Sequence, residues 1–248
     1  MATATWGALC REGRAAPTIL LTLSVGIHAI DVFIIATVLP SVVEEIGGAA
    51  FYAWSTMLYV VASILGAAGG GLARARWDVR RSYTLGTVLF LVGSLGCALA
   101  SSMAWLLLAR GLQGLGGGML MALSYGMVGE LYPESLRPRM FSLISGMWGA
   151  AALLGPSIGG IFAALGWWRG AFWSALPVIG GLAALAWLTL PATTHPRLPT
   201  AGRPPWQRLT LLGLGVLAVA WSGQVGGALA ATRMVRHGGR LHDAGLVE

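Results

Sequence analysis

Two ionisable residues, Asp31 and Arg110, lie deep inside long apolar stretches of the sequence. An unpaired charge at the centre of a bilayer costs about 3 kcal/mol on insertion scales, so such residues are normally paired or hydrated. A helix rises about 1.5 Å per residue. Asp31 therefore lies roughly 13 Å before the end of its segment and Arg110 roughly 10 Å after the start of its own, and both depths are measured from the same side of the membrane. Opposite charges at similar depth predict an ion pair or a shared water-filled cavity. The alternatives are that Arg110 caps nearby carbonyls or reaches outward, and that Asp31 only fixes helix packing.

Each of these charges belongs to a polar stripe at helical spacing. One stripe consists of Ser24, His28 and Asp31. The other, in the segment that contains Arg110, consists of Arg110, Gln113, Gly117 and Ser124. Such stripes normally face a bundle interior or an aqueous cavity. Asp31, Arg110, Gln113 and His28 are therefore candidates for proton coupling and substrate contact. For His28 the alternative to a proton relay is a structural hydrogen bond, which we expect.

The composition indicates an integral membrane protein. Of the 248 residues, 56% are hydrophobic and only 10% are charged, and the mean hydropathy is +0.74. A soluble domain has about 25% charged residues. The net charge of +7 therefore does not imply nucleic acid. Two cysteines, Cys10 and Cys97, are too few for a disulfide framework or a metal site. With no nucleophile–base pair either, we expect no enzyme, no cofactor and no metal.

Six stretches are long enough to span a bilayer, which takes roughly 20 apolar residues. They are residues 17–40, 52–73, 82–102, 104–129, 140–164 and 170–190. The predicted organisation is an N-terminal tail (1–16), a six-helix transmembrane bundle (17–190), a loop (191–207) and a partial seventh hydrophobic segment with a polar tail (208–248). The seventh segment, about 208–229, ends in polar and glycine residues. It either lies on the membrane surface or marks the place where a second half should continue.

The arginines indicate the orientation, because cytoplasmic loops carry the excess of positive charge. The N-terminal tail and the loops after the second, fourth and sixth spans hold most of them, namely Arg11, Arg14, Arg74, Arg76, Arg80, Arg81, Arg137, Arg139, Arg197, Arg203 and Arg208. The opposite loops contain Arg169 alone. This asymmetry predicts a cytoplasmic N-terminus and cytoplasmic even-to-odd loops.

The fifth predicted span is rich in glycine between Gly146 and Gly160. Pro156 removes the hydrogen bond to the carbonyl of Ala152, so a bend is expected there. Gly155 and Gly159 form a smooth strip on one face, where a neighbouring backbone can approach closely.

This pattern, Gly146 followed by Gly155-Pro156-x-x-Gly159-Gly160, resembles the fifth-helix antiporter motif of the major facilitator superfamily, which is typical of its drug/proton exporters. Other segments resemble the same family. They are Ile30-Asp31 with Val38-Leu39-Pro40 (Ala36 replaces a common Asn), Trp54 with Tyr59, Arg110-x-x-Gln113-Gly114, and Trp168-Arg169-x-x-Phe172. The resemblance implies a proton-transfer role for Arg110, and cation recognition or proton coupling for Asp31.

The loop after the second span keeps only part of the family's cytoplasmic motif. Gly70, Arg80 and Arg81 match, but Arg74 replaces the family's Asp and Trp77 replaces a Gly. Glu130 could pair with Arg80 or Arg81 and preserve the latch that this motif forms in the family. The alternative is a solvated arginine cluster that only sets orientation.

The resemblance covers residues 17–190 and implies an all-α fold, one N-terminal six-helix half built from two inverted three-helix repeats. The function it implies is proton-coupled efflux (antiport) of a small drug-like compound by alternating access, driven by the proton gradient. The protein would be a multi-pass protein of the cell membrane, with a second half-transporter or a homodimer as partner. The alternatives are a truncated or scaffold membrane protein without transport activity, and an uptake carrier of the same fold.

Overall fold

The computed structural model describes residues 5–192, 210–211, 213–215 and 218. The chain divides into two units at Pro204 and Pro205. The first unit contains six α-helices, namely α1 (Ala15–Ile46), α2 (Tyr52–Arg76), α3 (Val79–Ala98), α4 (Met103–Leu131), α5 (Arg137–Ala164) and α6 (Arg169–Thr189). Short 3-10 helices at Trp6–Cys10 and Ala49–Phe51 precede α1 and α2. The described residues of the second unit are helical. The rest of the predicted seventh segment and most of the 191–207 loop lie outside the described residues.

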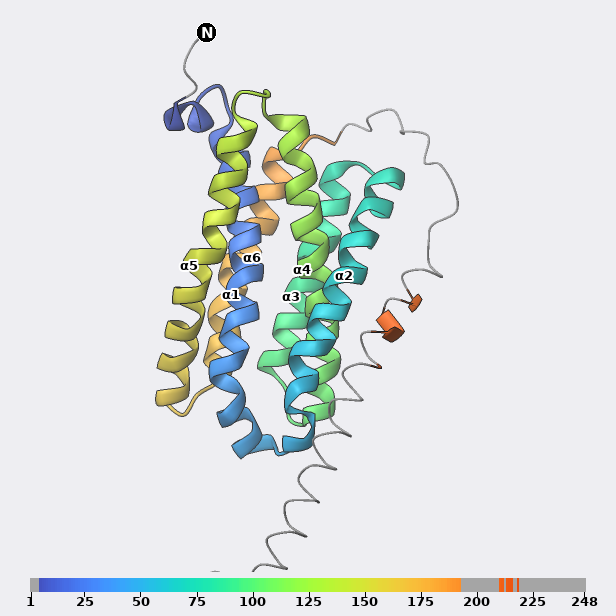
Figure 1. Ribbon diagram of the computed structural model, residues 1–248, viewed down its shortest axis with the longest axis vertical. Helices are drawn as coiled ribbons and strands as arrows, with labels where there is room; N and C mark the ends of the chain where they lie inside the picture. Colours follow the sequence, from blue (N-terminus) through green and yellow to red (C-terminus); the bar gives the residue numbers. More distant parts are fainter. Residues whose placement is uncertain (1–4, 193–209, 212, 216–217, 219–248) are drawn as a thin grey trace, which may run out of the picture. The chain divides into compact units, whose positions relative to one another are not determined.

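The six helices form one bundle in which neighbours in sequence run in opposite directions (Figure 1). Among the described residues, five helices are long and apolar enough to cross a membrane, all but α3. The α3 helix has 20 residues, and the polar residues Arg80, Arg81 and Ser82 lie in its first turn. It nevertheless packs inside the bundle against α4 and α6. The protein is thus the all-helical membrane bundle that the sequence predicts.

Two of the helix ends differ from the prediction. The first helix was expected to end near Pro40, but α1 continues through Pro40 to Ile46. A proline removes only one hydrogen bond of the helical ladder, which neighbouring groups in a membrane bundle can offset. The third helix begins at Val79 rather than residue 82, because the side chain of Asp78 accepts a hydrogen bond from the backbone N–H of Arg81 (2.8 Å) and caps the helix there.

The helix contacts show two inverted repeats, α1–α3 and α4–α6. In the exchange of the two repeats, α1 corresponds to α4, α2 to α5 and α3 to α6. The α2–α4 contact then corresponds to the α1–α5 contact, and the α3–α4 contact corresponds to the α1–α6 contact. The α1–α4 and α3–α6 pairs join equivalent helices. Exchanging the two triplets therefore maps the contacts onto themselves, and equivalent helices run in opposite directions (Figure 1). The α1–α4 contact is thus where the two repeats meet on their central helices.

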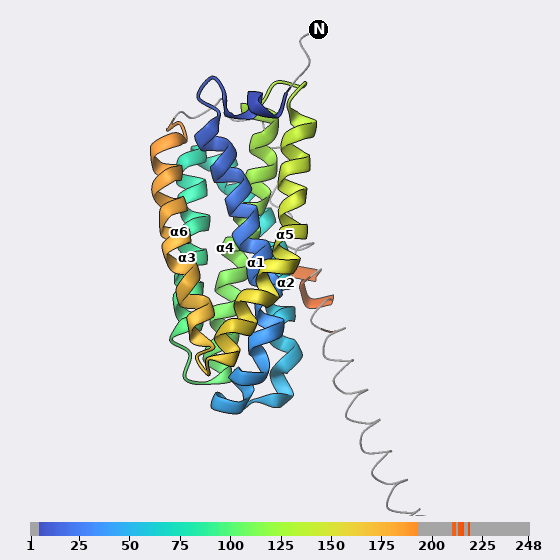
Figure 2. The same cartoon turned by 90° about the vertical axis from the view of Figure 1, so that its left-hand side faces the viewer.

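Two pairs of helices, α2 with α4 and α1 with α5, pack closely along strips of glycine. A Cβ at Gly114 or Gly118 of α4 would overlap the backbone of α2 at Tyr59 or Ser63. A Cβ at Gly155 would come within 2.6 Å of the Phe33 Cβ and 3.0 Å of the Ile30 carbonyl oxygen on α1. Both strips have the four-residue spacing that lets helices pack backbone to backbone in a membrane. The second half of α5 leans across α1 (Figure 2).

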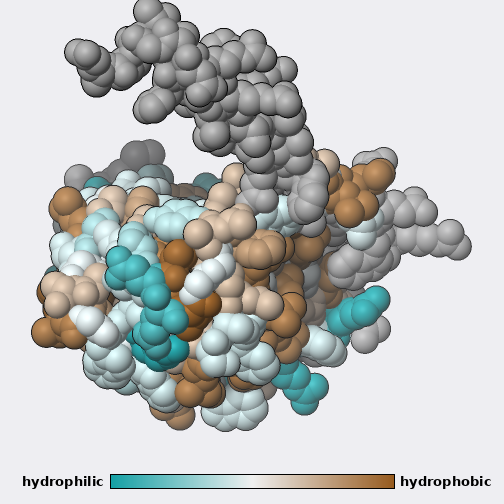
Figure 3. Space-filling model, turned by 90° about the horizontal axis from the view of Figure 1, so that it is seen from below, coloured by the Kyte–Doolittle hydropathy of each residue, from teal (hydrophilic) through white to brown (hydrophobic). Residues whose placement is uncertain are grey.

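The two ends of the bundle differ in charge. The end at which α1, α3 and α5 begin has an arginine cluster at the helix ends, including Arg14, Arg74, Arg76, Arg80, Arg81, Arg137 and Arg139. At the opposite end, strongly hydrophilic residues are few among apolar and weakly polar ones (Figure 3). Arg169 is the one arginine at this end among the residues that the structure describes, and it pairs with Glu45 at 2.5 Å.

Candidate functional site

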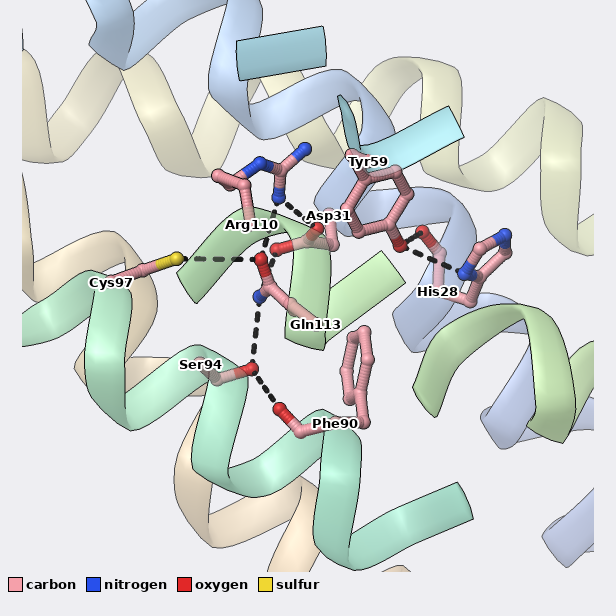
Figure 4. Close-up of polar contacts among 8 residues, drawn as sticks. All are labelled: His28, Asp31, Tyr59, Phe90, Ser94, Cys97, Arg110 and Gln113. Carbon is pink, nitrogen blue, oxygen red and sulfur yellow. Dashed lines mark hydrogen bonds and ion pairs between the residues drawn. The ribbon is translucent and has the colours of Figure 1, made fainter. Parts of the chain in front are cut away.

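The central contact between the repeats contains a buried ion pair. Asp31 on α1 is 6% exposed and Arg110 on α4 is fully buried. The Arg110 Nη1 lies 2.5 Å from the Asp31 Oδ2. Gln113, one turn after Arg110, donates from Nε2 to the Asp31 Oδ1 (2.8 Å) and accepts from the Arg110 Nη1 at its Oε1 (2.7 Å). Both carboxylate oxygens are therefore held by α4 (Figure 4).

Side chains of α3 hold Gln113 in this orientation. The Gln113 Nε2 also donates to the Ser94 hydroxyl (2.9 Å), which itself donates to the Phe90 carbonyl (2.8 Å). The Cys97 thiol donates to the Gln113 Oε1 (3.6 Å). Neither Ser94 nor Cys97 is among the site residues that the sequence predicts. The sequence feature that could have indicated this role is their three-residue spacing, which places Ser94 and Cys97 on one face of a helix.

His28 joins the site through Tyr59 of α2. The Tyr59 hydroxyl is hydrogen-bonded to the His28 Nδ1 at 2.8 Å, and the Tyr59 ring lies under the guanidinium, 4.0 Å from the Arg110 Cζ (Figure 4). The His28 ring also makes an edge contact with Trp148. Gly117 leaves room for this imidazole, because a Cβ there would overlap it. Tyr59 therefore links two of the predicted site residues, a role that its place in a motif did not reveal.

The remaining members of the two polar stripes also face each other. The Tyr83 hydroxyl of α3 donates to the Ser24 hydroxyl and lies 3.2 Å from the Ser124 hydroxyl. All three side chains are fully buried. The stripes of α1 and α4 thus lie inside the bundle, and Arg110 does not reach outward. The pair is enclosed by protein and does not lie in an open cavity.

The antiporter-motif glycines divide into two groups. Gly155 and Gly159 pack against α1, whereas Gly146 and Gly160 have nothing near the position of a Cβ. Pro156 lies within the continuous α5 helix. The packing strip predicted for Gly155 and Gly159 therefore faces α1.

The predicted partner of Glu130 was wrong. Glu130 pairs with Arg74 at 2.8 Å, not with Arg80 or Arg81. The cause is the parallel packing of α2 on α4, which brings the last turns of these two helices together. Arg80 instead donates to the Leu190 carbonyl beside α6 (2.8 Å), and Arg81 lies 3.3 Å from Asp78. Gly70 packs against Met119 of α4, which supports the same α2–α4 contact.

A pocket of about 360 Å³ lies between α1, α5 and α6 and contains none of the paired residues. Its lining is apolar except for Ser174, whose hydroxyl donates to the Ala171 carbonyl (2.9 Å). Among the described residues, no cluster of His, Cys, Asp or Glu could hold a metal ion.

Two inverted three-helix repeats joined by a buried ion pair define a multi-pass membrane protein with a transporter fold. The chain belongs to the Major Facilitator Superfamily, whose family model matches residues 21–239. This is a family of transporters, which as a family are not enzymes.

Relatives of known sequence and structure agree with this assignment. The chain is 36% identical over 230 residues to a probable multidrug-efflux transporter of Mycobacterium tuberculosis, covering 88% of this chain and 49% of the relative. It is 30% identical over 158 residues to multidrug resistance protein 3 of Bacillus subtilis, covering 64% of this chain and 31% of the relative. The crystal structure of a D-xylose–proton symporter superimposes with a TM-score of 0.63 at 19% identity, covering 84% of this chain and 53% of that one. The chain thus spans about half the length of the first of these relatives, or less.

Proposed function

We propose that this chain is one six-helix half of a proton-coupled efflux transporter that exports a small drug-like compound by alternating access. The observation that carries the proposal is the buried Asp31–Arg110 pair, which joins the two repeats. The name of the M. tuberculosis relative supports the outward direction, and the names of both relatives support a drug-like substrate.

Proton binding at Asp31 would change the free energy of the contact between α1 and α4. The ionised carboxylate attracts Arg110 across a buried interface, where water weakens the attraction least. A proton on Asp31 removes this attraction and leaves Arg110 and Gln113 with a poorer acceptor. Because Asp31 lies in one repeat and the other two residues in the second, protonation favours arrangements in which the repeats separate. A proton can shift a conformational equilibrium only through such a difference in interaction energy.

The transported compound would lie between this bundle and a second set of six helices, supplied by another half-transporter or by a second copy of this chain. Carriers of this fold bind substrate near the middle of the membrane, at the interface between repeats or halves. We propose a hydrophobic or cationic compound, because the interior of this half contains the carboxylate of Asp31 among mostly apolar side chains.

The test is proton-driven transport of ethidium in everted membrane vesicles from cells that express the chain. We expect ethidium accumulation that a protonophore abolishes and that Asp31→Asn reduces to background. Glu44→Gln is the matched control, because Glu44 lies on the same helix with an exposed side chain, and it should transport normally. Transport that survives Asp31→Asn would contradict the proposal, and a membrane-inserted, folded chain that moves no ethidium when expressed alone would exclude a second copy of this chain as the other half.

We also propose that the arginine-rich end of the bundle faces the cytoplasm, following the positive-inside rule. The native cysteines give a direct test, since Cys10 beside α1 is exposed and Cys97 is buried. A membrane-impermeant maleimide should label Cys10 in everted vesicles but not in intact cells. Labelling in intact cells would reverse the orientation, and a Cys10→Ser variant should remain unlabelled in both.

A further inference from the structure

Arg110 is satisfied on one side only. Its Nη1 serves both Asp31 and Gln113, whereas Nε and Nη2 have no hydrogen-bond partner among the described residues. The terminal nitrogen without dashed lines in Figure 4 points away from Asp31 and Gln113. The side chain is fully buried, so bulk water does not reach these donors. A buried donor without an acceptor costs about 1–3 kcal/mol, which makes the free edge of Arg110 a place where an acceptor would bind.

A second unsatisfied group lies at the same level on α2. Gly114 packs on the backbone of Tyr59 and Gly118 on that of Ser63, so α2 and α4 run parallel with matching steps of four residues. Arg110, one turn before Gly114, is therefore level with the turn of α2 from Ser55 to Tyr59. The Tyr59 ring already lies against the guanidinium. The Ser55 hydroxyl is fully buried and has no hydrogen-bond partner among the described residues.

We propose that Ser55 and the free edge of Arg110 form a buried subsite between α2 and α4 for one neutral oxygen. The Nε–H and Nη2–H groups of a guanidinium point in parallel and can both donate to a single oxygen. The Ser55 hydroxyl adds a third contact, as a donor to a carbonyl oxygen or as an acceptor from a water molecule. The oxygen is that of a water molecule or of a carbonyl or hydroxyl group on a bound compound.

The charges around the subsite favour a neutral oxygen over an anion. Asp31 already neutralises Arg110 at 2.5 Å. A second carboxylate on the same guanidinium would leave a net negative charge in a buried site, which is strongly unfavourable unless it is paired. A neutral oxygen satisfies the donors without this cost. The subsite does not depend on the proposed transport activity.

Nuclear magnetic resonance of arginine side chains in the full, ¹⁵N-arginine-labelled chain tests the subsite in detergent micelles. The Arg110 Nε–H signal is assigned by its loss in Arg110→Lys. We expect a cross-peak between this signal and a long-lived water, reduced several-fold in Ser55→Ala and restored in Ser55→Thr. Ser63→Ala is the matched control, two turns further along α2, and should leave the cross-peak unchanged. Addition of chloramphenicol, a neutral amide, distinguishes the sources, since a carbonyl in the subsite would displace the water and shift the Nε–H signal.

Each outcome decides the proposal. A water cross-peak that depends on Ser55 supports the subsite with water as its occupant, and its replacement by a chloramphenicol-induced shift supports the subsite with a substrate oxygen. An Nε–H signal that shows neither a water contact nor a chloramphenicol response overturns it. A water contact that Ser55→Ala leaves unchanged, in a variant with wild-type circular dichroism, also overturns it.

Discussion

The α3–α4 contact and the α1–α6 contact both join the two repeats and are equivalent when the repeats are exchanged, but only the first is closed by glycine. A Cβ at Gly93 or Gly116 would overlap the backbone of the facing helix. A Cβ at Gly96 would lie 3.0 Å from the Cβ of Ala109. Between α1 and α6, by contrast, lies the apolar pocket of about 360 Å³. The glycine of α1, Gly26, faces the flexible end of Met147 on α5 and no backbone.

The difference follows from how many neighbours each central helix approaches backbone to backbone. The α4 helix packs backbone to backbone on α2 through one glycine strip and on α3 through another. The α1 helix meets α5 closely only because α5 supplies the glycines. Backbone contacts cannot yield to added volume, whereas side-chain contacts can shift rotamer or fill space. The α4 side should therefore be the rigid part of the bundle, and the α1–α5–α6 side the tolerant part.

The largest effect is expected where α4 touches backbone. Gly118→Leu places a side chain where the Ser63 carbonyl lies, so we expect a loss of more than about 3 kcal/mol, the upper end for overpacking. Gly126→Leu on the same helix has open space and should be nearly neutral. Thermal unfolding in detergent, followed by circular dichroism, measures both. Equal stability of the two variants would disprove the rigid α2–α4 contact.

Breaking the ion pair between the repeats should have the next largest effect. Asp31→Leu leaves Arg110 buried and unpaired, and removal of one partner of a buried pair costs about 3–5 kcal/mol. Arg110→Met should cost a similar amount. The double variant should recover most of the loss, since an apolar replacement of the whole pair is often neutral. Additive losses in this cycle would mean that the two residues do not stabilise each other.

Gly155→Leu probes the glycine strip at the equivalent contact, where α5 packs on α1. Its neighbours are the Phe33 side chain and the Ile30 carbonyl, and Phe33 can move, so we expect a smaller loss of about 1–3 kcal/mol. Gly160→Leu, with nothing nearby, is its control. A loss as large as that of Gly118→Leu would remove the contrast between the two sides.

The sequence predicted most of the fold because the length of a hydrophobic stretch is a strong local signal. It also predicted that Asp31 and Arg110 would meet, because each stands alone in an apolar segment and a buried charge needs a partner. It could not predict that Glu130 pairs with Arg74, because this depends on which helix ends pack side by side. It did not include Tyr59 and Ser94 among the site residues, since Tyr and Ser are common packing residues and their roles here arise from three-dimensional contact with Arg110 and Gln113.

The smallest changes in stability are expected from adding volume at the α1–α6 and α3–α4 contacts, and these changes should have opposite signs. Ala175→Leu points extra methyl groups at the α1–α5–α6 pocket that Ala175 lines, and filling a cavity commonly stabilises by about 0.5–2 kcal/mol. Ala109→Leu makes the same chemical change on α4 opposite Gly96, where the contact is already tight, and should destabilise by about 1–3 kcal/mol. Both are measured as shifts in thermal unfolding relative to the unmodified chain. Because the substitution is identical, its effect on helix propensity is the same, and opposite signs can arise only from the packing of the two sites. Destabilisation by Ala175→Leu would show that the pocket does not offer usable space, and the α1–α6 and α3–α4 contacts would then be equally tightly packed.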